Sequence, residues 1–261
     1  MTDKQDFINT LVDKWGVENI SDGLKNINEY EPRLYFDVNK DCGYFYLDAS
    51  DSLIDGIKDN LSDYGPVFAE DSEIKKKTPI TWTVYLSKKP GKVDIPELKI
   101  VPFPKGYYFD LDKGHLLAKE FMQYIGSNIE ELRPFFYKNK RSNIIYQFKN
   151  VNRNCNGKYG QSLFETRVIK EIEENNSNIY YQIEPVFYDE QDEIPIGTRI
   201  IAFRDTDNKS DFNLDKKDIK VPFHVFVPNY DDSKDNIKKY PKNINGNRDF
   251  YKHGLKGKKD E

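Results

Sequence analysis

Three groups of residues in this sequence could take part in acid–base or metal chemistry. The first is Asp112-Lys113-Gly114-His115, which follows the aromatic stretch Tyr107-Tyr108-Phe109. Because the imidazole of histidine changes its charge near neutral pH, it suits the role of a general base. The simpler interpretation is a turn at the end of a strand, with Gly114 at a positive φ angle.

The second group is rich in asparagine. Its members are Asn143, Gln147, Asn150, Asn152, Arg153, Asn154 and Asn156. Asparagine side chains bond the nearby backbone and tolerate the left-handed region, so they are typical of turns. Because the whole chain is rich in asparagine, this cluster alone indicates a loop.

The third group centres on Glu165. Ser162 and Glu165 have the spacing of a helix capping box, with Ser162 as the N-cap. Projection of the helix at about 100° per residue also places Glu165 inside the apolar arc formed by Phe164, Val168 and Ile172. A carboxylate on a buried face is costly unless it is paired or bonded. Glu165 is therefore a candidate functional residue as well as a candidate cap.

In this order, the three groups resemble the DNA/RNA non-specific endonucleases, which are ββα-metal (His-Me finger) nucleases with the signature Asp-Arg-Gly-His. The resemblance covers roughly residues 76–230 and includes Ile183-Glu184-Pro185-Val186 and Phe226-Val227-Pro228-Asn229. It implies an α+β fold, in which a ββα-metal nuclease core has a mainly antiparallel sheet flanked by helices. Residues 1–75 have no part in the resemblance.

The resemblance also implies a role for each matching residue. His115 matches the general base, Asn152 the asparagine that binds the single divalent metal ion, Mg²⁺ (with Mn²⁺ as the alternative), and Glu165 the glutamate that steadies water on the metal. Asp112 matches the signature acid and has a supporting role. Lys113 stands where the family has arginine, and a point charge positions phosphate less tightly than a planar fork. The candidate phosphate contacts are Lys113, Arg153 and Arg167.

The spacing between the metal ligand and the helix glutamate is unusual. Asn152 and Glu165 are 13 residues apart and would lie about 140° from each other on an unbroken helix. We expect Gly157 and Gly160 to break the helix between them. Asn150, Asn154 and Asn156 stay open as alternative ligands.

The resemblance therefore implies a metal-dependent endonuclease that hydrolyses the phosphodiester bonds of DNA, and of RNA, without sequence preference. Residues 133–170 have nine basic residues and one acidic residue, a net charge of +8 that suits a nucleic-acid backbone. A solvated helical face is the simpler interpretation. The alternative function is an inactive nuclease fold that binds nucleic acid or protein. A nuclease toxin or effector with a neutralising immunity protein is the expected context.

The elements that must position these groups follow from hydrophobic periodicity. We expect helices over residues 7–15, 53–61 (capped by Asp51 or Ser52), 116–125 and 163–174. The expected strands cover residues 34–36, 44–46, 80–86, 98–101, 107–111, 179–188, 199–203 and 222–227, and residues 143–148 are a further candidate. We expect an acidic N-terminal α/β region over residues 1–75, a nuclease domain over 76–230 and a basic tail over 231–261, with a linker at 70–77.

Composition excludes several other classes of protein. Two cysteines and three histidines cannot form a disulfide framework, a four-thiolate zinc site or a multi-histidine centre. The longest uncharged runs hold 10 residues, too few to span a bilayer, so we expect no membrane partner. The first residues lack a basic-then-apolar signal pattern. We expect a soluble protein, cytoplasmic as synthesised, with leaderless export as the alternative.

Overall fold

The computed structural model describes residues 33–37, 42–47, 49–64, 67–69, 81–88, 111–125, 143–153, 160–186, 195, 197–212 and 219–229. The strands are β1 (Arg33–Asp37), β2 (Cys42–Tyr46), β3 (Val67–Ala69), β4 (Trp82–Leu86), β5 (Leu111–His115), β6 (Ile144–Phe148), β7 (Ile179–Val186), β8 (Gly197–Arg204) and β9 (Phe223–Pro228). The α-helices are α3 (Asp51–Tyr64), α5 (Lys149–Arg153) and α6 (Gln161–Asn175), and two short 3₁₀ helices are η2 (Lys119–Gln123) and η5 (Lys209–Asp211).

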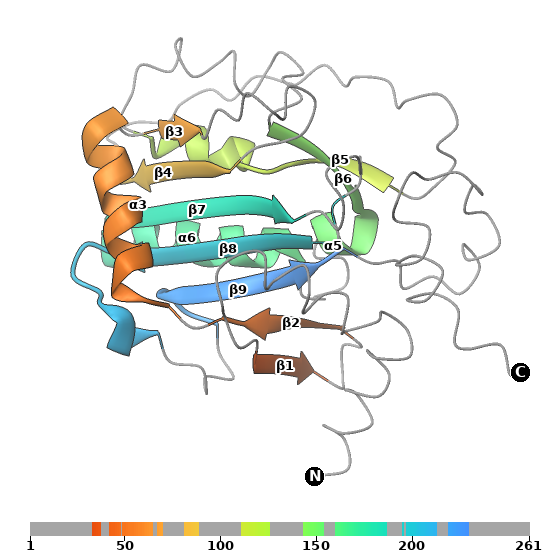
Figure 1. Cartoon of the computed structure of the whole chain (residues 1–261). Coiled ribbons are helices and arrows are strands. Elements are labelled where there is room, and N and C mark those ends of the chain that lie inside the picture. The colour runs from red at the N-terminus through yellow and green to blue at the C-terminus, as the bar shows by residue number, and fades with distance from the viewer. Residues whose placement is uncertain are drawn as a thin grey trace, which may run out of the picture.

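The strands form one large sheet and one separate hairpin (Figure 1). Seven strands are ordered β1-β2-β9-β8-β7-β4-β3, and each neighbouring pair is antiparallel. The hairpin pairs β5 with β6 and lies beside one end of this sheet. The expected α+β fold with a mainly antiparallel sheet is confirmed.

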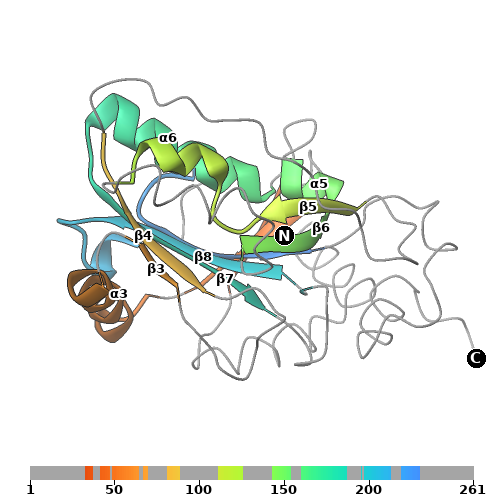
Figure 2. The ribbon, with the colours of Figure 1, turned by 90° about the horizontal axis from the view of Figure 1, so that it is seen from above.

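Helices cover the large sheet on both faces, with α6 on one side and α3 on the other (Figure 2). Strand β8 contributes apolar side chains to both faces of the large sheet, because its successive residues point alternately into two cores. Ile200 and Ala202 belong to the core that includes the buried face of α6, whereas Ile201 and Phe203 pack in the core beneath α3. The apolar α6 residues are Phe164, Val168 and Ile172, as the periodicity predicts.

The start of α3 differs from the expectation. The helix is confirmed, with Ile54, Ile57 and Leu61 buried. Its cap is Ser50, however, because the Ser50 hydroxyl accepts a hydrogen bond from the Leu53 N–H at 3.2 Å and the Ser50 carbonyl accepts one from the Ile54 N–H at 3.1 Å. The prediction of Asp51 or Ser52 as the cap was therefore one or two residues late.

Two other expected helix features also change. Residues 116–125 contain only the short 3₁₀ helix η2 in an otherwise irregular segment. The N–H groups of Leu116 and Leu117 bond to Asn143, and the Phe121 N–H bonds to the Ala118 carbonyl three residues earlier, so no α-helical ladder forms here. The undecided segment 143–148 is strand β6. The expectations for residues 7–15, 70–77, 98–101 and the tail 231–261 lie outside the described residues.

The described part of residues 1–75 belongs to the same sheet as the later strands. β2 pairs with β9 through Phe45↔Phe226 and Tyr46↔Val225, and β3 pairs with β4. The domain boundary at residue 75 stays a prediction, but the sheet is continuous across it. No helix in the described ranges is both long and apolar enough to cross a membrane.

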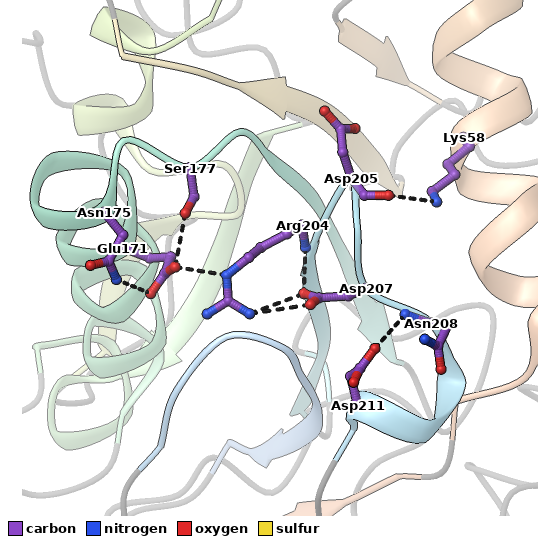
Figure 3. Close-up of polar contacts among 9 residues, drawn as sticks. All are labelled: Lys58, Glu171, Asn175, Ser177, Arg204, Asp205, Asp207, Asn208 and Asp211. Carbon is purple, nitrogen blue, oxygen red and sulfur yellow. Dashed lines mark hydrogen bonds and ion pairs between the residues drawn. The ribbon is translucent and has the colours of Figure 1, made fainter.

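A polar network joins the end of α6 to the end of β8 (Figure 3). Arg204 Nε donates to Glu171 Oε1 at 2.7 Å, and the Arg204 backbone N–H donates to Asp207 Oδ2 at 2.7 Å. The Ser177 hydroxyl and the Asn175 amide also donate to Glu171. Although burial alone would raise the pKa of Glu171, these hydrogen bonds hold it below its usual value. The network fixes the orientation of α6 from its C-terminal end.

Candidate active site

The hairpin of β5 and β6 presents two different faces. Asp112 lies opposite Gln147 and Gly114 lies opposite Ile145, and all four are buried. Their neighbours Lys113, His115, Ile144 and Tyr146 alternate with them and are half-buried. Because successive strand residues point to opposite faces, Asp112 and Gly114 face one side, whereas Lys113 and His115 share the more open side.

Asp112 organises the first two polar side chains of the candidate site. Its Oδ2 accepts a hydrogen bond from Asn152 Nδ2 at 3.0 Å. Arg153 donates from Nε and Nη2 to the two carboxylate oxygens of Asp112, which is a bidentate ion pair. Strand β5 supplies the acid and α5 supplies both of its partners. Asp112 therefore fixes the orientation of the expected metal ligand and of a candidate phosphate contact.

Gly114 lets two amide side chains approach the backbone of β5. A Cβ atom at this position would lie 2.2 Å from Gln147 Oε1 and 2.9 Å from Asn152 Oδ1, closer than real Cβ contacts allow. Gly114 is a residue of β5, so the interpretation as a turn with positive φ was wrong. The glycine is needed for close approach, and no turn is present here.

Glu165 is held by a side-chain hydrogen bond, in place of the expected capping box. The N-cap of α6 is Gly160 in an extended conformation without a side-chain cap, and Ser162 already lies inside the helix. Glu165 Oε1 accepts a hydrogen bond from Gln161 Nε2 at 2.7 Å, one helical turn earlier. The predicted cap was therefore wrong, whereas the placement of Glu165 toward the packed face of α6 holds.

Burial raises the pKa of Glu165 to about 8, against the lowering effect of the Gln161 hydrogen bond, and the charge of Glu120 raises it further. The residue as a whole is half-buried, so its carboxyl is the enclosed end. A carboxyl with this pKa accepts a proton readily near neutral pH.

Gln161 connects Glu165 to the hairpin. Its Nε2 also donates to the His115 carbonyl at 2.7 Å and to the Leu116 carbonyl at 3.1 Å, and its Oε1 accepts from Gln147 Nε2 at 2.8 Å. The sequence analysis missed Gln161. On the same helical projection it falls at about 160°, inside the apolar arc, so the signal that selected Glu165 would have found it.

Two buried asparagines hold the ends of the hairpin. Asn143 Oδ1 accepts from the Leu117 N–H at 2.7 Å, and its Nδ2 donates to the Leu117 carbonyl at 3.3 Å. Asn229 Oδ1 accepts from the Phe148 N–H at 2.9 Å, and its Nδ2 donates to the Tyr146 carbonyl at 3.0 Å. Each side-chain amide thus pairs with the main chain of the hairpin segment as the peptide group of a neighbouring strand would. The sequence analysis quoted both residues without assigning them this role.

The remaining predicted residues lie apart from this cluster. Burial lowers the pKa of Lys113, whose Nζ is enclosed on the side of the hairpin that it shares with His115. Arg167 follows Glu165 by two residues, about 200° around α6, so the two side chains do not share a face. Within the described segments the buried Arg167 Nε has no hydrogen-bond partner. The structure therefore unites Asp112, Asn152 and Arg153 directly, connects Glu165 to the main chain of His115, and does not bring Arg167 to them.

The oxygen atoms around Gly114 suit a hard divalent cation. The bond from Asn152 Nδ2 to Asp112 directs Asn152 Oδ1 toward Gly114, and the buried Gln147 Oε1 beside it has no hydrogen-bond partner among the described residues. Those residues contain no group of three or more His, Cys, Asp or Glu side chains that could hold a metal. Mg²⁺ binds oxygen and keeps several waters, so one amide oxygen is a sufficient ligand. The residues present fit such an ion.

The break between α5 and α6 also agrees with the expectation. α5 ends at Arg153 and α6 begins at Gln161, so Asn152 and Glu165 belong to different helices, which pack against each other. The angle of about 140° on a single helix therefore does not separate them.

Comparisons with known proteins identify similar molecules. A sequence model of the DNA/RNA non-specific endonuclease family matches residues 51–248. The crystal structure of NucA from Streptococcus agalactiae with magnesium ion bound is 18% identical, with a TM-score of 0.50, over 82% of this chain and 89% of that chain. NucA with no metal bound is 16% identical, with a TM-score of 0.48, over 81% and 89% of the two chains.

A third solved structure, Sda1 nuclease with bound zinc ion, is 13% identical, with a TM-score of 0.44, over 80% of this chain and 93% of that chain. No match is found among proteins of curated function. At 18% identity, the similarity to magnesium-bound NucA shows a shared fold.

Proposed function

Because this chain belongs to the DNA/RNA non-specific endonuclease family, we propose that it is a metal-dependent endonuclease that hydrolyses phosphodiester bonds of DNA, and of RNA, without sequence preference. The observation that carries this proposal is the cluster in which Asp112 orients Asn152 and Arg153 on α5. Glu165 joins this cluster from α6, tied through Gln161 to the main chain of His115.

In the proposed reaction, His115 is the general base. It is the last residue of β5 and lies on the more open face of the hairpin, where a neutral imidazole can take a proton from water. Loss of that proton prepares the water for in-line attack on phosphorus. Glu165 steadies the water around the site through its enclosed carboxyl.

Asn152 Oδ1 is the proposed ligand of one Mg²⁺, with Mn²⁺ as the alternative ion. When bound, the ion supplies a Lewis acid that polarises the phosphodiester and neutralises charge on the leaving oxygen. Asp112 supports this role by holding Asn152 Nδ2, so the amide oxygen cannot rotate away from the site without loss of a hydrogen bond.

Lys113, Arg153 and Arg167 are the proposed phosphate contacts. Lys113 shares a face with His115, which favours contact with the cleaved phosphate. The Arg153 guanidinium is paired with Asp112, but 56% of the surface of its side chain is exposed, so it can still attract the phosphates of a nucleic acid. Arg167 does not share a face of α6 with Glu165, so we propose for it a contact with flanking phosphates.

Plasmid digestion tests the proposed function. We expect the protein to cut supercoiled DNA with Mg²⁺ and to stop when EDTA is added. His115→Ala should lose activity by about 10²–10⁴-fold while it stays folded, because a general base typically contributes that much. His224→Ala is the control, since His224 lies buried in β9 and pairs in register with Ile201. It should reduce stability but not the rate per folded molecule.

Two outcomes would contradict the proposal. Cleavage by His115→Ala at the wild-type rate would remove His115 from the reaction. Retained nucleic-acid binding without any cleavage under Mg²⁺ or Mn²⁺ would favour the alternative function, an inactive nuclease fold that binds nucleic acid or protein.

We also propose a neutralising protein partner and the toxin or effector role that accompanies it. A nuclease without sequence preference would attack the genome of the cell that makes it. Co-expression tests this proposal: wild-type protein should be toxic to a host cell unless its partner is present, whereas His115→Ala should be tolerated alone. Equal toxicity of the wild-type protein and His115→Ala would mean that the toxicity does not come from cleavage.

A further inference from the structure

We propose that Gln161 is a positioning residue of the cleavage site, whose buried amide holds the main chain of His115 at a fixed place relative to Glu165. The inference rests on the proposed function, because it takes His115 and Glu165 as members of that site. Gln161 lies in the first turn of α6, and only 1% of its surface is exposed.

The amide of Gln161 uses its hydrogen-bonding capacity on the site alone. Its Nε2 lies 2.7 Å from the His115 carbonyl, 3.1 Å from the Leu116 carbonyl and 2.7 Å from Glu165 Oε1. Its Oε1 accepts from Gln147 Nε2 at 2.8 Å. One side chain therefore bonds both strands of the hairpin and the carboxyl on its own helix.

The orientation of this amide is determined by its partners. Main-chain carbonyls can only accept hydrogen bonds, so the nitrogen of Gln161 must face His115 and Leu116. Its oxygen must then face Gln147, which places Gln147 Oε1 against Gly114. The chain of amides has only one consistent direction, and it ends beside Asn152 Oδ1.

This position matters for the chemistry because reacting groups must be aligned closely. A misplacement of about 1 Å can cost about 10²-fold in rate. His115 is the last residue of β5, and the next residue, Leu116, is held to β6 by the hydrogen bond from its N–H to the Asn143 carbonyl at 2.9 Å. The bonds from Gln161 add the link from this end of the strand to α6. Without Gln161 we expect the end of β5 to move relative to α6, and the His115 imidazole to move with it.

The test uses the full chain with two variants of Gln161 and one control. Gln161→Met keeps the length of the side chain and removes both N–H donors, whereas Gln161→Asn keeps the amide but shortens it by one methylene. Gln182→Met is the matched control. Gln182 is also a buried glutamine, 7% exposed, and donates to Thr83 Oγ1 in the large sheet. It has no described bond to the hairpin.

Two measurements are made on each folded variant. The first is kcat and KM on a duplex DNA substrate with Mg²⁺. The second is the His115 imidazole NMR signal in metal-free, histidine-labelled protein, which is assignable because the chain has only three histidines and His115→Ala lacks that signal. The NMR signal reports the position of His115 whether or not the protein is active.

We expect Gln161→Met to lower kcat about 10–100-fold with KM changed less than about threefold, and to shift the His115 signal. Gln161→Asn should show a smaller loss, and Gln182→Met should leave kcat and the signal unchanged. Wild-type kcat with an unmoved signal in Gln161→Met would overturn the inference. If that variant does not fold, the same comparison between Gln161→Asn and Gln182→Met decides.

Failure of the proposed function gives a different result. If the wild-type chain does not cleave DNA, the proposed function is wrong, and the NMR comparison still shows whether Gln161 fixes His115. If the wild-type chain cleaves and Gln161→Met neither slows cleavage nor moves the signal, only the positioning inference is wrong.

Discussion

Asp112 determines how the two residues at the end of α5 can act. A carboxylate that accepts from both the Asn152 amide and the Arg153 guanidinium leaves one Asn152 orientation, with Oδ1 toward Gly114. This geometry supports Asn152 as the metal ligand, and Asn150, Asn154 and Asn156 stay open as alternatives. That choice stays a prediction until the residues are compared by mutation.

We predict that Asn152→Ala loses most Mg²⁺-dependent cleavage and keeps nucleic-acid binding. The variant removes the proposed metal oxygen, whereas binding depends on the basic residues of 133–170. Plasmid cleavage and binding of a labelled duplex in EDTA measure the two effects separately. Ser62→Ala, an exposed change on α3, is the control. A larger loss of cleavage in Asn150→Ala or Asn154→Ala than in Asn152→Ala would move the ligand to that residue.

Glu165 predicts a pH dependence of stability in the metal-free protein. Its pKa is about 8 in the folded chain against an ordinary value of 4.5, so folding favours the protonated form. The contribution of the protonated Glu165 carboxyl to the free energy of unfolding is fully present below about pH 4.5 and is lost as the pH rises through about 8. The charged carboxylate then costs free energy in its enclosed place.

Replacing the acid should therefore stabilise the protein only at high pH. In EDTA, Glu165→Gln should melt a few °C above the wild type at pH 8–9, at about 2–4 °C per kcal/mol for a protein of this size, and close to it at pH 5. Thermal melts across this range measure the difference, and Glu174→Gln, an exposed change on the same helix, should show none. A difference in Tm that does not vary with pH would refute this account, whatever the effect on cleavage.

At the scale of elements, hydrophobic periodicity predicted the helices and strands that bury an apolar face. It failed for the helix caps, which depend on single polar contacts. The apolar spacing of α3 and α6 and the alternation in the central strands were sufficient to place those elements, because burial of one face fixes them. The caps were wrong at both helices: Ser50 replaces Asp51 or Ser52, and Gly160 replaces Ser162. Several neighbouring residues could cap each helix, and only tertiary contacts choose among them.

The position of the hairpin could not be predicted for a related reason. Asn143, Gln161 and Asn229 bind main-chain groups of residues 26 to 83 positions away in the chain. No local pattern marks such partners. The order of the motifs was sufficient to indicate the family, which the match over residues 51–248 confirms, whereas the amides that hold the hairpin became visible only in three dimensions.

Asn229 should be the most important of these contacts for the stability of the hairpin. It binds the Phe148 N–H and the carbonyls of Tyr146 and Pro195, and it is 1% exposed. Asn229→Ala leaves three buried main-chain groups without this partner, so we expect the free energy of unfolding to fall by about 2–4 kcal/mol. Urea unfolding measures it, with Ser62→Ala as an exposed control on α3 that should change it by less than about 0.5 kcal/mol. Equal stability of the two variants would mean that Asn229 does not hold the hairpin.

At the scale of the whole molecule, the described strands and helix of the acidic N-terminal part are built into the fold, so we expect their removal to damage it. Strands β2 and β3 pair with β9 and β4, and α3 covers Ile201 and Phe203. Charge and composition indicate an acidic region over residues 1–75, and its described strands β2 and β3 pair with later strands of the chain. One hypothesis is that the acidic residues of this region attract the basic residues of 133–170 and so weaken the binding of nucleic acid. A chain that starts near Ile74 would expose the core under α3, so this hypothesis must be tested in the full chain.

The location of α3 predicts the outcome of that test for its own acids. Asp51, Asp55 and Asp59 are exposed on α3, which covers the face of the large sheet opposite α6 (Figure 2). The sheet lies between them and α6, and exposed charges are screened over about 8–10 Å at 0.1–0.15 M ionic strength.

Asp55→Asn and Asp59→Asn together should therefore change the affinity for DNA by less than about twofold at 0.15 M salt. The measurement is binding of a labelled duplex by the His115→Ala chain, with and without the two changes, at low and moderate salt. Binding that becomes several-fold tighter at low salt, with the gap closing at higher salt, would show that the α3 acids mask the basic residues. Equal affinities would leave α3 as a structural layer of the sheet, with its acidic face available to a basic partner.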